Sequence, residues 1–392
     1  MNFEFATAQR ILFGPGRLRE LPALCQSLGT RAALVTGSNA ERITPVFETL
    51  RNCGANPAAF SIIAEPTTQR MASISTQARE AGCDFVVAFG GGSVIDAGKA
   101  LAALLTNTRD LMDYLEVIGK GQPLENDPAP CIAIPTTAGT GSEVTRNAVL
   151  RSPEHQVKVS MRHPKMLPTV ALVDPELTLS LPPETTAGTG LDAFTQLLEA
   201  FVSCRANPLT DGLCREGLEC VSRSLLHAYT HGNDLKARTD MALGSLLGGL
   251  ALANAGLGAV HGFAGPIGGM FEAPHGMVCA ALLPAVFKTN LKALEARDAD
   301  NPALGKYHEV ARLVTQSRNA EITDALDWIK EICMHMHVPG LEDFGITEAD
   351  IPALVSKGRQ ASSMKGNPVP LTDDELIAVL QASLAPTVAN DA

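Results

Sequence analysis

The first half of the chain alternates short apolar runs with helical patterns, and this alternation is the feature that most restricts the possible fold. The runs are rich in β-formers, are bounded by turn residues, and cover residues 31–36, 57–62, 84–89, 131–135 and 169–173. Helical patterns lie between them, for example at 40–53 and 67–82. Near-continuous apolar strands that alternate with helices form parallel sheets covered on both faces. We therefore predict an α/β domain with a Rossmann-like parallel sheet over residues 1–180.

The second half shows no strand signal after Asp174-Pro175. Its helical patterns cover residues 184–202, 208–230, 235–260, 277–294, 303–315, 320–337 and 372–384. We predict an all-helical C-terminal domain over residues 181–392, and a chain of 392 residues is long enough for two such domains. A ligand is expected between the two domains, because ligand sites often lie at domain interfaces.

Charge and composition exclude several classes of partner. The net charge of −11, without any basic run, argues against a nucleic-acid partner, since phosphate binding needs clustered Lys and Arg. The nine cysteines are dispersed without a CxxC pair, which is typical of free thiols in a reducing compartment. The N-terminus has no basic region followed by a long apolar stretch, so no secretory signal is expected. These features predict a cytoplasmic location.

One segment has the length of a membrane span. No charged residue occurs from Met241 to Val260. The segment is rich in Ala and Gly, however, and a buried helix packed closely against its neighbours explains this composition better. We expect a core helix here and no membrane partner.

A glycine-rich loop follows the strand predicted at 84–89. The sequence GGGSVIDAGK, residues 90–99, places three glycines before a helix, where backbone N–H groups and the helix dipole can hold an anion. Asp96 falls in the first turns of that helix. The pattern matches neither the GxGxxG fingerprint nor the GxxxxGK[ST] loop, and a plain glycine turn would also fit it. It predicts a phosphate-binding loop.

A second polar loop, residues 135–150, follows the next strand. It offers four hydroxyl groups, those of Thr136, Thr137, Thr140 and Ser142. Open α/β sheets bind ligands at the carboxyl ends of their strands. A polar turn that caps a helix is the simpler alternative, but two such loops after successive strands favour a ligand site.

The helical half contains a set of side chains that suits a metal ion. Asp192 and Gln196 lie four residues apart and therefore on one face of a helix. His261 and His275 lie in a stretch broken by Gly and Pro. Two histidines and a carboxylate can bind Zn²⁺ or Fe²⁺ and leave a coordination position for a substrate oxygen. Spacing alone also allows purely structural histidines.

Together, these blocks resemble the iron-dependent (group III) alcohol dehydrogenase family. The matching landmarks follow the family's order over nearly the whole chain: Phe13-Gly14-Pro15-Gly16, Glu65-Pro66, 90–99, 135–145, Asp174-Pro175, 190–203, 261–269 and 274–276. The resemblance implies a Rossmann-like domain followed by a helical domain, a homodimer or larger homo-oligomer, and hydride transfer between a nicotinamide and a small alcohol, aldehyde or ketone.

The resemblance also implies roles for individual residues. Pyrophosphate binding falls to Gly91, Gly92 and Ser93. Contacts on the nicotinamide and ribose side fall to Thr136, Thr137, Thr140 and Lys158. Asp96, in the segment at 90–99, is a further predicted cofactor contact. Metal-ligand positions are occupied by Asp192, His261 and His275, which with Lys158 form the predicted catalytic set.

Two positions depart from the family pattern. Gln196 stands where the second ligand on the first helix is normally histidine, and Gly265 stands where a histidine is credited with proton relay. Glutamine can coordinate through its amide oxygen, though less strongly than imidazole, so we predict Asp192, Gln196, His261 and His275 as the metal site. Related glycerol dehydrogenases and dehydroquinate synthases resemble an arrangement with one Asp and two His.

The choice of nicotinamide depends on the turn after the strand at 31–36. NAD sites usually have an Asp or Glu there, which accepts hydrogen bonds from the ribose and repels a 2′-phosphate. This chain has Gly37-Ser38-Asn39, no acid before Glu41, and then Arg42. Gly37 and Ser38 are the predicted cofactor contacts, and NADP is expected, with NAD as the alternative. An ordinary polar turn with Arg42 pointing to solvent would leave the site indifferent.

The favoured function is metal-assisted reduction of an aldehyde or ketone, or the reverse oxidation, with the proton supplied by water or the cofactor ribose. A metal-independent reductase of the maleylacetate type would need cationic groups, for which Arg146, Lys158 and Arg162 are the nearby candidates. A lyase resembling dehydroquinate synthase would need more basic residues than the helical half has. A non-catalytic nucleotide-binding relative is the alternative from a different class.

Overall fold

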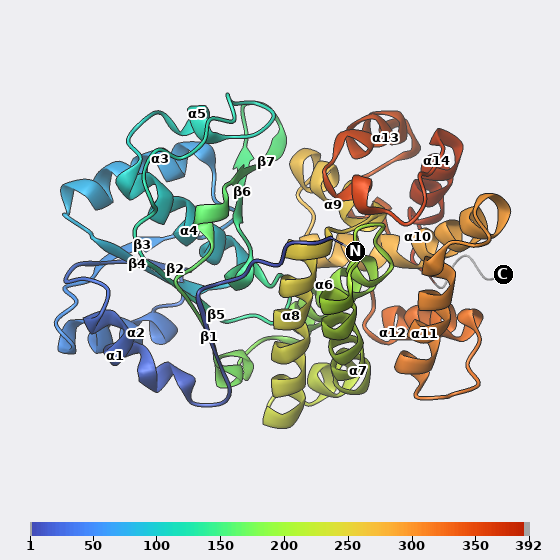
Figure 1. Ribbon diagram of the computed structural model, residues 1–392, viewed down its shortest axis with the longest axis horizontal. Helices are drawn as coiled ribbons and strands as arrows, with labels where there is room; N and C mark the ends of the chain where they lie inside the picture. Colours follow the sequence, from blue (N-terminus) through green and yellow to red (C-terminus); the bar gives the residue numbers. More distant parts are fainter. Residues whose placement is uncertain (1, 388–392) are drawn as a thin grey trace. The chain divides into compact units, whose positions relative to one another are not determined.

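A computed structural model describes residues 2–387, which divide into two compact units. The α/β unit comprises residues 6–137 and 141–178. The helical unit comprises residues 2–5, 138–140 and the described part of the chain from 179 onward. Figure 1 shows strands only in the part coloured from blue to green, and helices alone from α6 onward.

A parallel sheet of six strands forms the centre of the α/β unit. In chain order these are β1 (Arg10–Phe13), β2 (Ala32–Thr36), β3 (Ala58–Ser61), β4 (Phe85–Gly90), β5 (Cys131–Pro135) and β8 (Val170–Val173). The order across the sheet is β1-β8-β5-β4-β2-β3, and every neighbouring pair is parallel. The predicted sheet is confirmed. The sequence analysis missed β1, a four-residue strand at the sheet edge with a charged first residue.

Helices cover both faces of this sheet, as the continuous apolar strands predicted. They are α1 (Leu21–Gln26), α2 (Ala40–Asn52), α3 (Thr68–Glu80), α4 (Gly92–Thr106) and the short α5 (Leu111–Tyr114). Successive residues of β4 enter different cores: Val86 packs in the cluster that includes α3 and α4, and Val87 in the cluster that includes α1 and α2. The four inner strands β2, β4, β5 and β8 are therefore buried on both sides.

A separate antiparallel hairpin consists of β6 (Asn147–Ser152) and β7 (Val157–Arg162), and β6 begins inside the stretch at 135–150 that was predicted to be a polar loop. The sequence analysis did not predict it. Only alternate residues of β6 are buried, among them Ala148 and Leu150, while Val149 is exposed. Such an alternating strand lacks the apolar run by which the other strands were recognised.

The second unit is all-helical, as predicted. It contains α6 (Pro183–Val202), α7 (Pro208–Thr230), α8 (Leu235–Ala255), α9 (Ala259–Met270), α10 (His275–Arg297), α11 (Pro302–Thr315), α12 (Ile322–His335), α13 (Ile351–Gln360) and α14 (Asp373–Ala382). Helix α6 packs against α7, α8 and α10 and is buried along nearly its whole length.

The helix predicted at 235–260 ends earlier than predicted, and a second helix, most of which was not predicted, starts near the end of that span. Helix α8 ends at Ala255, because Gly256 has a φ of 71° that a helix cannot continue, and α9 starts at Ala259 with its axis turned by 98°. Helix α13 was also missed.

By length and composition α10 could cross a membrane, as could the bent pair of α8 and α9. However, 67% of the apolar window of α10 is buried, as in a core helix.

Candidate metal centre and cofactor loops

The predicted phosphate loop joins β4 to α4. Gly91 is the N-cap residue of α4 and provides no side-chain cap, so no N-cap side chain covers the N–H groups of the first turn. A Cβ atom at Gly90 would lie 2.6 Å from the Val94 side chain, so the turn needs glycine there. The N-terminus of this uncapped 15-residue helix, directly after a central strand, is suited to bind an anion.

The second polar loop adjoins the first, because β4 and β5 are neighbours. Gly90 pairs with Pro135, and the N–H of Thr136 donates to the carbonyl of Gly90 at 2.9 Å. A Cβ atom at Gly91 would lie 3.4 Å from the Thr137 side chain. The structure thus brings Gly91, Gly92, Ser93, Thr136 and Thr137 to one edge of the sheet, whereas Thr140 belongs to the helical unit.

Asp96 connects the phosphate-loop helix to the hairpin. Its carboxylate accepts hydrogen bonds from the Ser142 hydroxyl and from the N–H of Val149 at 2.9 Å, and pairs with Lys99 at 3.0 Å. The buried Lys99 also donates to the Thr145 hydroxyl at 2.8 Å. Asp96 therefore has structural partners within the α/β unit, and its contact with a cofactor stays a prediction.

Glu143, next to Ser142, is buried in the same unit. Burial raises the pKa of its carboxyl from 4.5 to about 7, and a backbone hydrogen bond and the charge of Lys99 offset this only in part.

Lys158 lies on β7, where its ammonium group pairs with the carboxylate of Glu65. Its side chain is only 8% exposed, so this ion pair holds the ammonium group largely out of water. The predicted nicotinamide-side role of Lys158 is not tested by this geometry.

The turn after β2 lies beside the phosphate loop, since β2 and β4 are paired and the order of the strands reverses there. No atom lies within 4 Å of a Cβ built on Gly37, so the space is open. Asn39 caps α2 by accepting from the N–H of Arg42 at 3.2 Å. The Arg42 guanidinium donates to the Leu177 carbonyl, so it is engaged within the unit and does not simply point to solvent.

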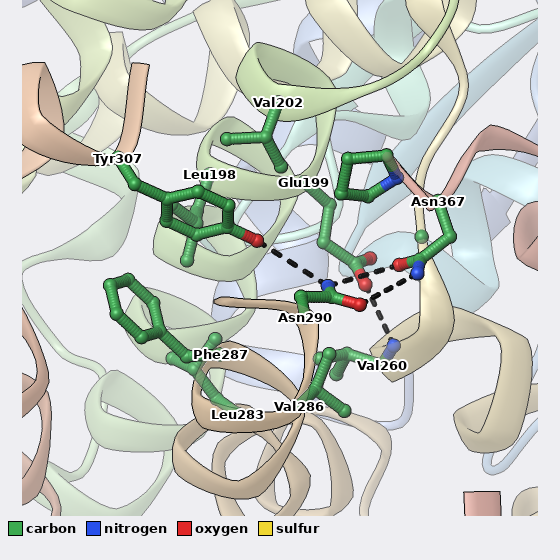
Figure 2. Close-up of a pocket in the computed structure, with 12 residues that line it drawn as sticks. Leu198, Glu199, Val202, Val260, Leu283, Val286, Phe287, Asn290, Tyr307 and Asn367 are labelled. Carbon is green, nitrogen blue, oxygen red and sulfur yellow. Dashed lines mark hydrogen bonds between the residues drawn. The ribbon is translucent and has the colours of Figure 1, made fainter. Parts of the chain in front are cut away.

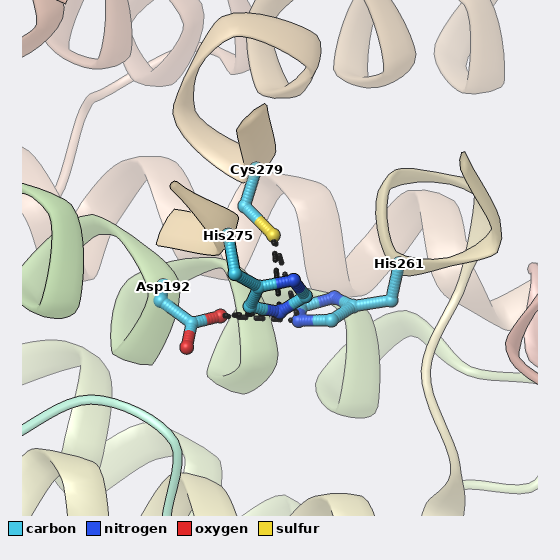
Figure 3. Close-up of side chains that lie close together, drawn as sticks. All are labelled: Asp192, His261, His275 and Cys279. Atoms are coloured by element: carbon cyan, nitrogen blue, oxygen red, sulfur yellow. Dashed lines mark hydrogen bonds and ion pairs between the residues drawn. The ribbon is translucent and has the colours of Figure 1, made fainter. Parts of the chain in front are cut away.

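The metal candidates converge in the helical unit. Asp192 of α6, His261 of α9 and His275 of α10 are joined by a fourth side chain, Cys279 of α10. One donor atom from each lies within 4.8 Å of all the others (Figure 3). The Asp192 Oδ1 atom is 3.1 Å from His261 Nε2 and 3.8 Å from His275 Nε2. This donor set fits a divalent cation.

Glu199, two turns after Asp192 on α6, fixes the position of His261. Its carboxylate accepts hydrogen bonds from His261 Nδ1 at 2.7 Å and from the N–H of Val260 at 2.7 Å. The bond to Nδ1 leaves Nε2 directed at Asp192. A carboxylate behind a histidine in this way orients a metal ligand.

Helix α9 thus begins with caps supplied from distant segments. Gly258 offers no side-chain cap, and the N–H of Ala259 donates instead to Asn367 Oδ1 at 3.1 Å. Figure 2 shows Asn367 paired with Asn290 beside the Glu199–Val260 bond. A Cβ atom at Gly258 would lie 2.8 Å from the Glu199 carboxylate, so only glycine permits this close approach.

A second close approach brings α10 to α6. A Cβ atom on Gly276 would lie 2.0 Å from the carbonyl oxygen of Gly188. Gly276 follows His275, and Gly188 is one helical turn before Asp192. Contact between these two glycines therefore sets the separation of the two ligand candidates.

The cluster is electrostatically coupled. Burial would lower the pKa of His261, but Cys279, Asp192 and Glu199 together raise it well above its usual value. Burial would raise the pKa of the Cys279 thiol, yet the two imidazoles lower it, and the pKa of Asp192 is also lowered, against burial, chiefly by its hydrogen bond to His261. A cation that binds these side chains must displace the protons that the imidazoles and the thiol carry at its donor atoms.

Comparison with known proteins identifies the family of this chain. The family model for iron-containing alcohol dehydrogenases matches residues 8–175, and the model for the C-terminal part of Fe-containing alcohol dehydrogenases matches residues 186–384. The chain belongs to the iron-containing alcohol dehydrogenase family. It is therefore an oxidoreductase that acts on CH–OH groups, and its family implies a nicotinamide cofactor, a divalent metal and small alcohol or aldehyde substrates.

Individual relatives match along almost their whole length. The chain is 33% identical to a 1,3-propanediol dehydrogenase of Klebsiella pneumoniae, covering 97% of this chain and 98% of that one. It is 35% identical to long-chain-alcohol dehydrogenase 1 of Geobacillus thermodenitrificans, with the same coverage. A solved structure of 1,3-propanediol oxidoreductase aligns with a TM-score of 0.90 at 32% identity, over 98% of this chain and 100% of that one.

A sulfoacetaldehyde reductase from Bifidobacterium kashiwanohense, solved in complex with NAD⁺, aligns with a TM-score of 0.84 at 29% identity. The alignment covers 98% of this chain and 99% of that one.

The structure shows what surrounds Gln196 and Gly265, the two residues that depart from the pattern of iron-containing alcohol dehydrogenases. Gln196 is buried beside Asp192, and its hydrogen bond is one cause of the lowered pKa of that carboxyl. Its Oε1 atom is buried without a hydrogen-bond partner. Gly265 has open space: no atom lies within 4 Å of a Cβ built there.

Sequence reasoning missed Cys279 and Glu199. Cys279 follows His275 by four residues on one helix, which is the same i, i+4 spacing that pointed to Asp192 and Gln196. Glu199 follows Asp192 by seven residues and so lies on the same face of α6. Both could have been found by applying helical spacing around each predicted ligand.

Proposed function

We propose that the protein is an NAD(P)-dependent dehydrogenase that interconverts a small alcohol and its aldehyde or ketone, with a divalent cation held by Asp192, His261 and His275. The observation that carries this proposal is the convergence of these three side chains from three helices on one point, where Asp192 and His261 are buried and His275 is partly exposed. The chemistry that a cation supplies there is Lewis-acid polarisation of a carbonyl oxygen. Relatives named for propanediol and for long-chain alcohols support an alcohol as the substrate class.

The helical unit keeps the ligands ready for the cation. Glu199 accepts the Nδ1 proton of His261 and so leaves Nε2 free to face the cation. The Gln196 amide donates to Asp192, and the orphaned Oε1 atom leaves open the predicted role of Gln196 as a metal ligand.

In the α/β unit, the uncapped start of α4 with Gly91, Gly92 and Ser93 receives the cofactor pyrophosphate. The space at Gly37, and the lack of an acid at the end of β2, accommodate a 2′-phosphate. We infer that NADP is preferred over NAD, with Ser38 as a further contact and Thr136, Thr137, Thr140 and Lys158 on the nicotinamide and ribose side.

The proton for the alcohol oxygen does not come from a side chain at residue 265. Gly265 carries no acid or base, and the open space beside it accommodates water. We infer that water or a cofactor hydroxyl supplies this proton during carbonyl reduction and accepts it during alcohol oxidation.

Metal analysis and chelation test the proposal. His275→Ala should lose the metal and turnover together, measured with a panel of aldehydes and keto acids, while it still binds the nicotinamide. The matched control is His335→Ala, which removes an exposed histidine of α12. A wild-type enzyme that stays fully active after exhaustive chelation would contradict the metal-assisted mechanism and support a metal-independent reductase.

The assembly and location of the protein are also proposals. A homodimer or larger homo-oligomer follows from the family resemblance, and sedimentation analysis tests it. All nine cysteines are free, which agrees with the reducing cytoplasm that we propose as its location.

A further inference from the structure

Cys279 lies among the metal candidates, on the face of α10 directed at both histidines (Figure 3). Its buried Sγ atom is 3.8 Å from His261 Nε2 and 3.7 Å from His275 Nε2. Neutral thiols make only weak hydrogen bonds, so two imidazole contacts at these distances stabilise a thiol little. Thiolates, in contrast, are strong ligands of Zn²⁺ and related ions.

Four of the six separations between the donor atoms are close to the edges of a tetrahedron around one ion, and the other two are at most 4.8 Å. Bonds of 2.0–2.1 Å to nitrogen or oxygen and 2.3 Å to sulfur place tetrahedral donors about 3.3 Å apart for nitrogen and oxygen, and about 3.5 Å apart for nitrogen and sulfur. The carboxylate oxygen lies 3.1 and 3.8 Å from the imidazole nitrogens, and the sulfur lies 3.7 and 3.8 Å from them. Shifts of a few tenths of an ångström would complete the site.

We propose that Cys279 is the fourth protein donor, so that Asp192, His261, His275 and Cys279 form a closed, thiolate-containing centre that selects Zn²⁺ over Fe²⁺. This inference rests on the metal site of the proposed function. When the ion binds, the Cys279 thiol releases its proton to solvent and the thiolate coordinates. Soft sulfur favours zinc over iron, whereas the amide oxygen of Gln196 is a harder and weaker donor.

Gln196 then has a different role. Its amide donates to Asp192 and orients that carboxylate, while Cys279 takes the fourth position in this assignment. Four protein donors would fill a tetrahedral site, so a substrate oxygen would have to bind the ion as an additional ligand. The chain thus replaces an absent imidazole on α6 by a thiolate on α10.

Cobalt spectroscopy tests this assignment without measuring activity. Metal-free protein is titrated with Co²⁺, and its near-ultraviolet spectrum is recorded for the sulfur-to-cobalt charge-transfer band that a bound thiolate produces. Wild type and Gln196→Ala should both show the band. Cys279→Ala should lack the band and should bind Co²⁺ more than about 100-fold more weakly. Loss of a residue that only orients a ligand weakens metal binding by at most about 100-fold.

The control is Cys333→Ala, which removes another buried thiol of the same unit and should keep both the band and the affinity. Wild-type protein that binds Co²⁺ without the band overturns the role of Cys279, whatever the folding of the variants, but leaves the metal site of the proposed function intact. Wild-type protein that binds no Co²⁺ overturns both. A band that persists in Cys279→Ala also overturns the assignment.

Discussion

Replacing Gly276 by alanine should weaken metal binding through a backbone clash. The added Cβ would lie 2.0 Å from the Gly188 carbonyl oxygen, whereas ordinary contact starts at 3.4 Å, so α10 must move from α6 by about 1.4 Å. Metal–ligand bonds tolerate only about 0.2 Å, and His275 adjoins the clash. We expect metal affinity to fall about 10–100-fold, as for loss of an orienting group.

The cost to folding should be smaller than the loss of metal binding. Overpacking costs about 1–3 kcal/mol, and the better helix propensity of alanine offsets up to about 1 kcal/mol of this. Isothermal titration with Zn²⁺ measures the affinity, and urea unfolding of the metal-free protein measures the stability. The matched control is Gly305→Ala in α11, where no atom lies within 4 Å of the new Cβ; this change should raise stability by about 0.5–1 kcal/mol and leave metal affinity unchanged. If Gly276→Ala binds Zn²⁺ as tightly as the wild type, glycine packing does not set the ligand geometry.

Two further predictions concern the α/β unit. Gly37→Asp should shift kcat/KM selectivity towards NADH by about tenfold or more, because a carboxylate in this open space repels a 2′-phosphate; a wild type that strongly prefers NADH would refute this reading. The second concerns Glu143, whose pKa of about 7 in the folded protein lies above the ordinary 4.5. The protonated carboxyl therefore contributes its whole share of the free energy of unfolding below pH 4.5. This share, at most about 3 kcal/mol, is lost as the pH rises to about 7. Glu143→Gln should remove this pH dependence from the hydrogen-exchange protection factors of β4 and β5, and an unchanged dependence would show that Glu143 is ionised throughout.

The sequence predicted the parts of the fold that local patterns determine. Five of the six sheet strands are apolar runs, four of which are buried along their whole length, and most of the helices from Pro183 onward were also predicted from their patterns. The hairpin β6–β7 was missed because its buried residues alternate with polar ones over a short stretch. The break between α8 and α9 was missed because Gly256 and Gly258 lie in a segment already rich in glycine, where their backbone conformation could not be inferred.

The sequence predicted which residues belong to the sites, but not which of them contact one another. Asp192, His261 and His275 do converge, although the spacing of the last two, on different helices, could not show it. The contacts of Glu199 and Cys279 with them depend on how three helices pack, which depends on close approaches such as that at Gly276. The hydrogen bond from Arg42 to Leu177 could not be predicted either, because the two residues lie 135 positions apart in the sequence.

The distant caps on α9 have a consequence for the folding kinetics of the helical unit. The N–H groups at the start of this helix find their acceptors 61 residues away at Glu199 and 108 residues away at Asn367. Contacts between residues so far apart in sequence close large loops and form slowly. His261 therefore reaches its final orientation only after α6 and the segment around Asn367 have docked, so the appearance of metal binding during refolding should report the last steps of folding and lag behind the recovery of helical circular dichroism.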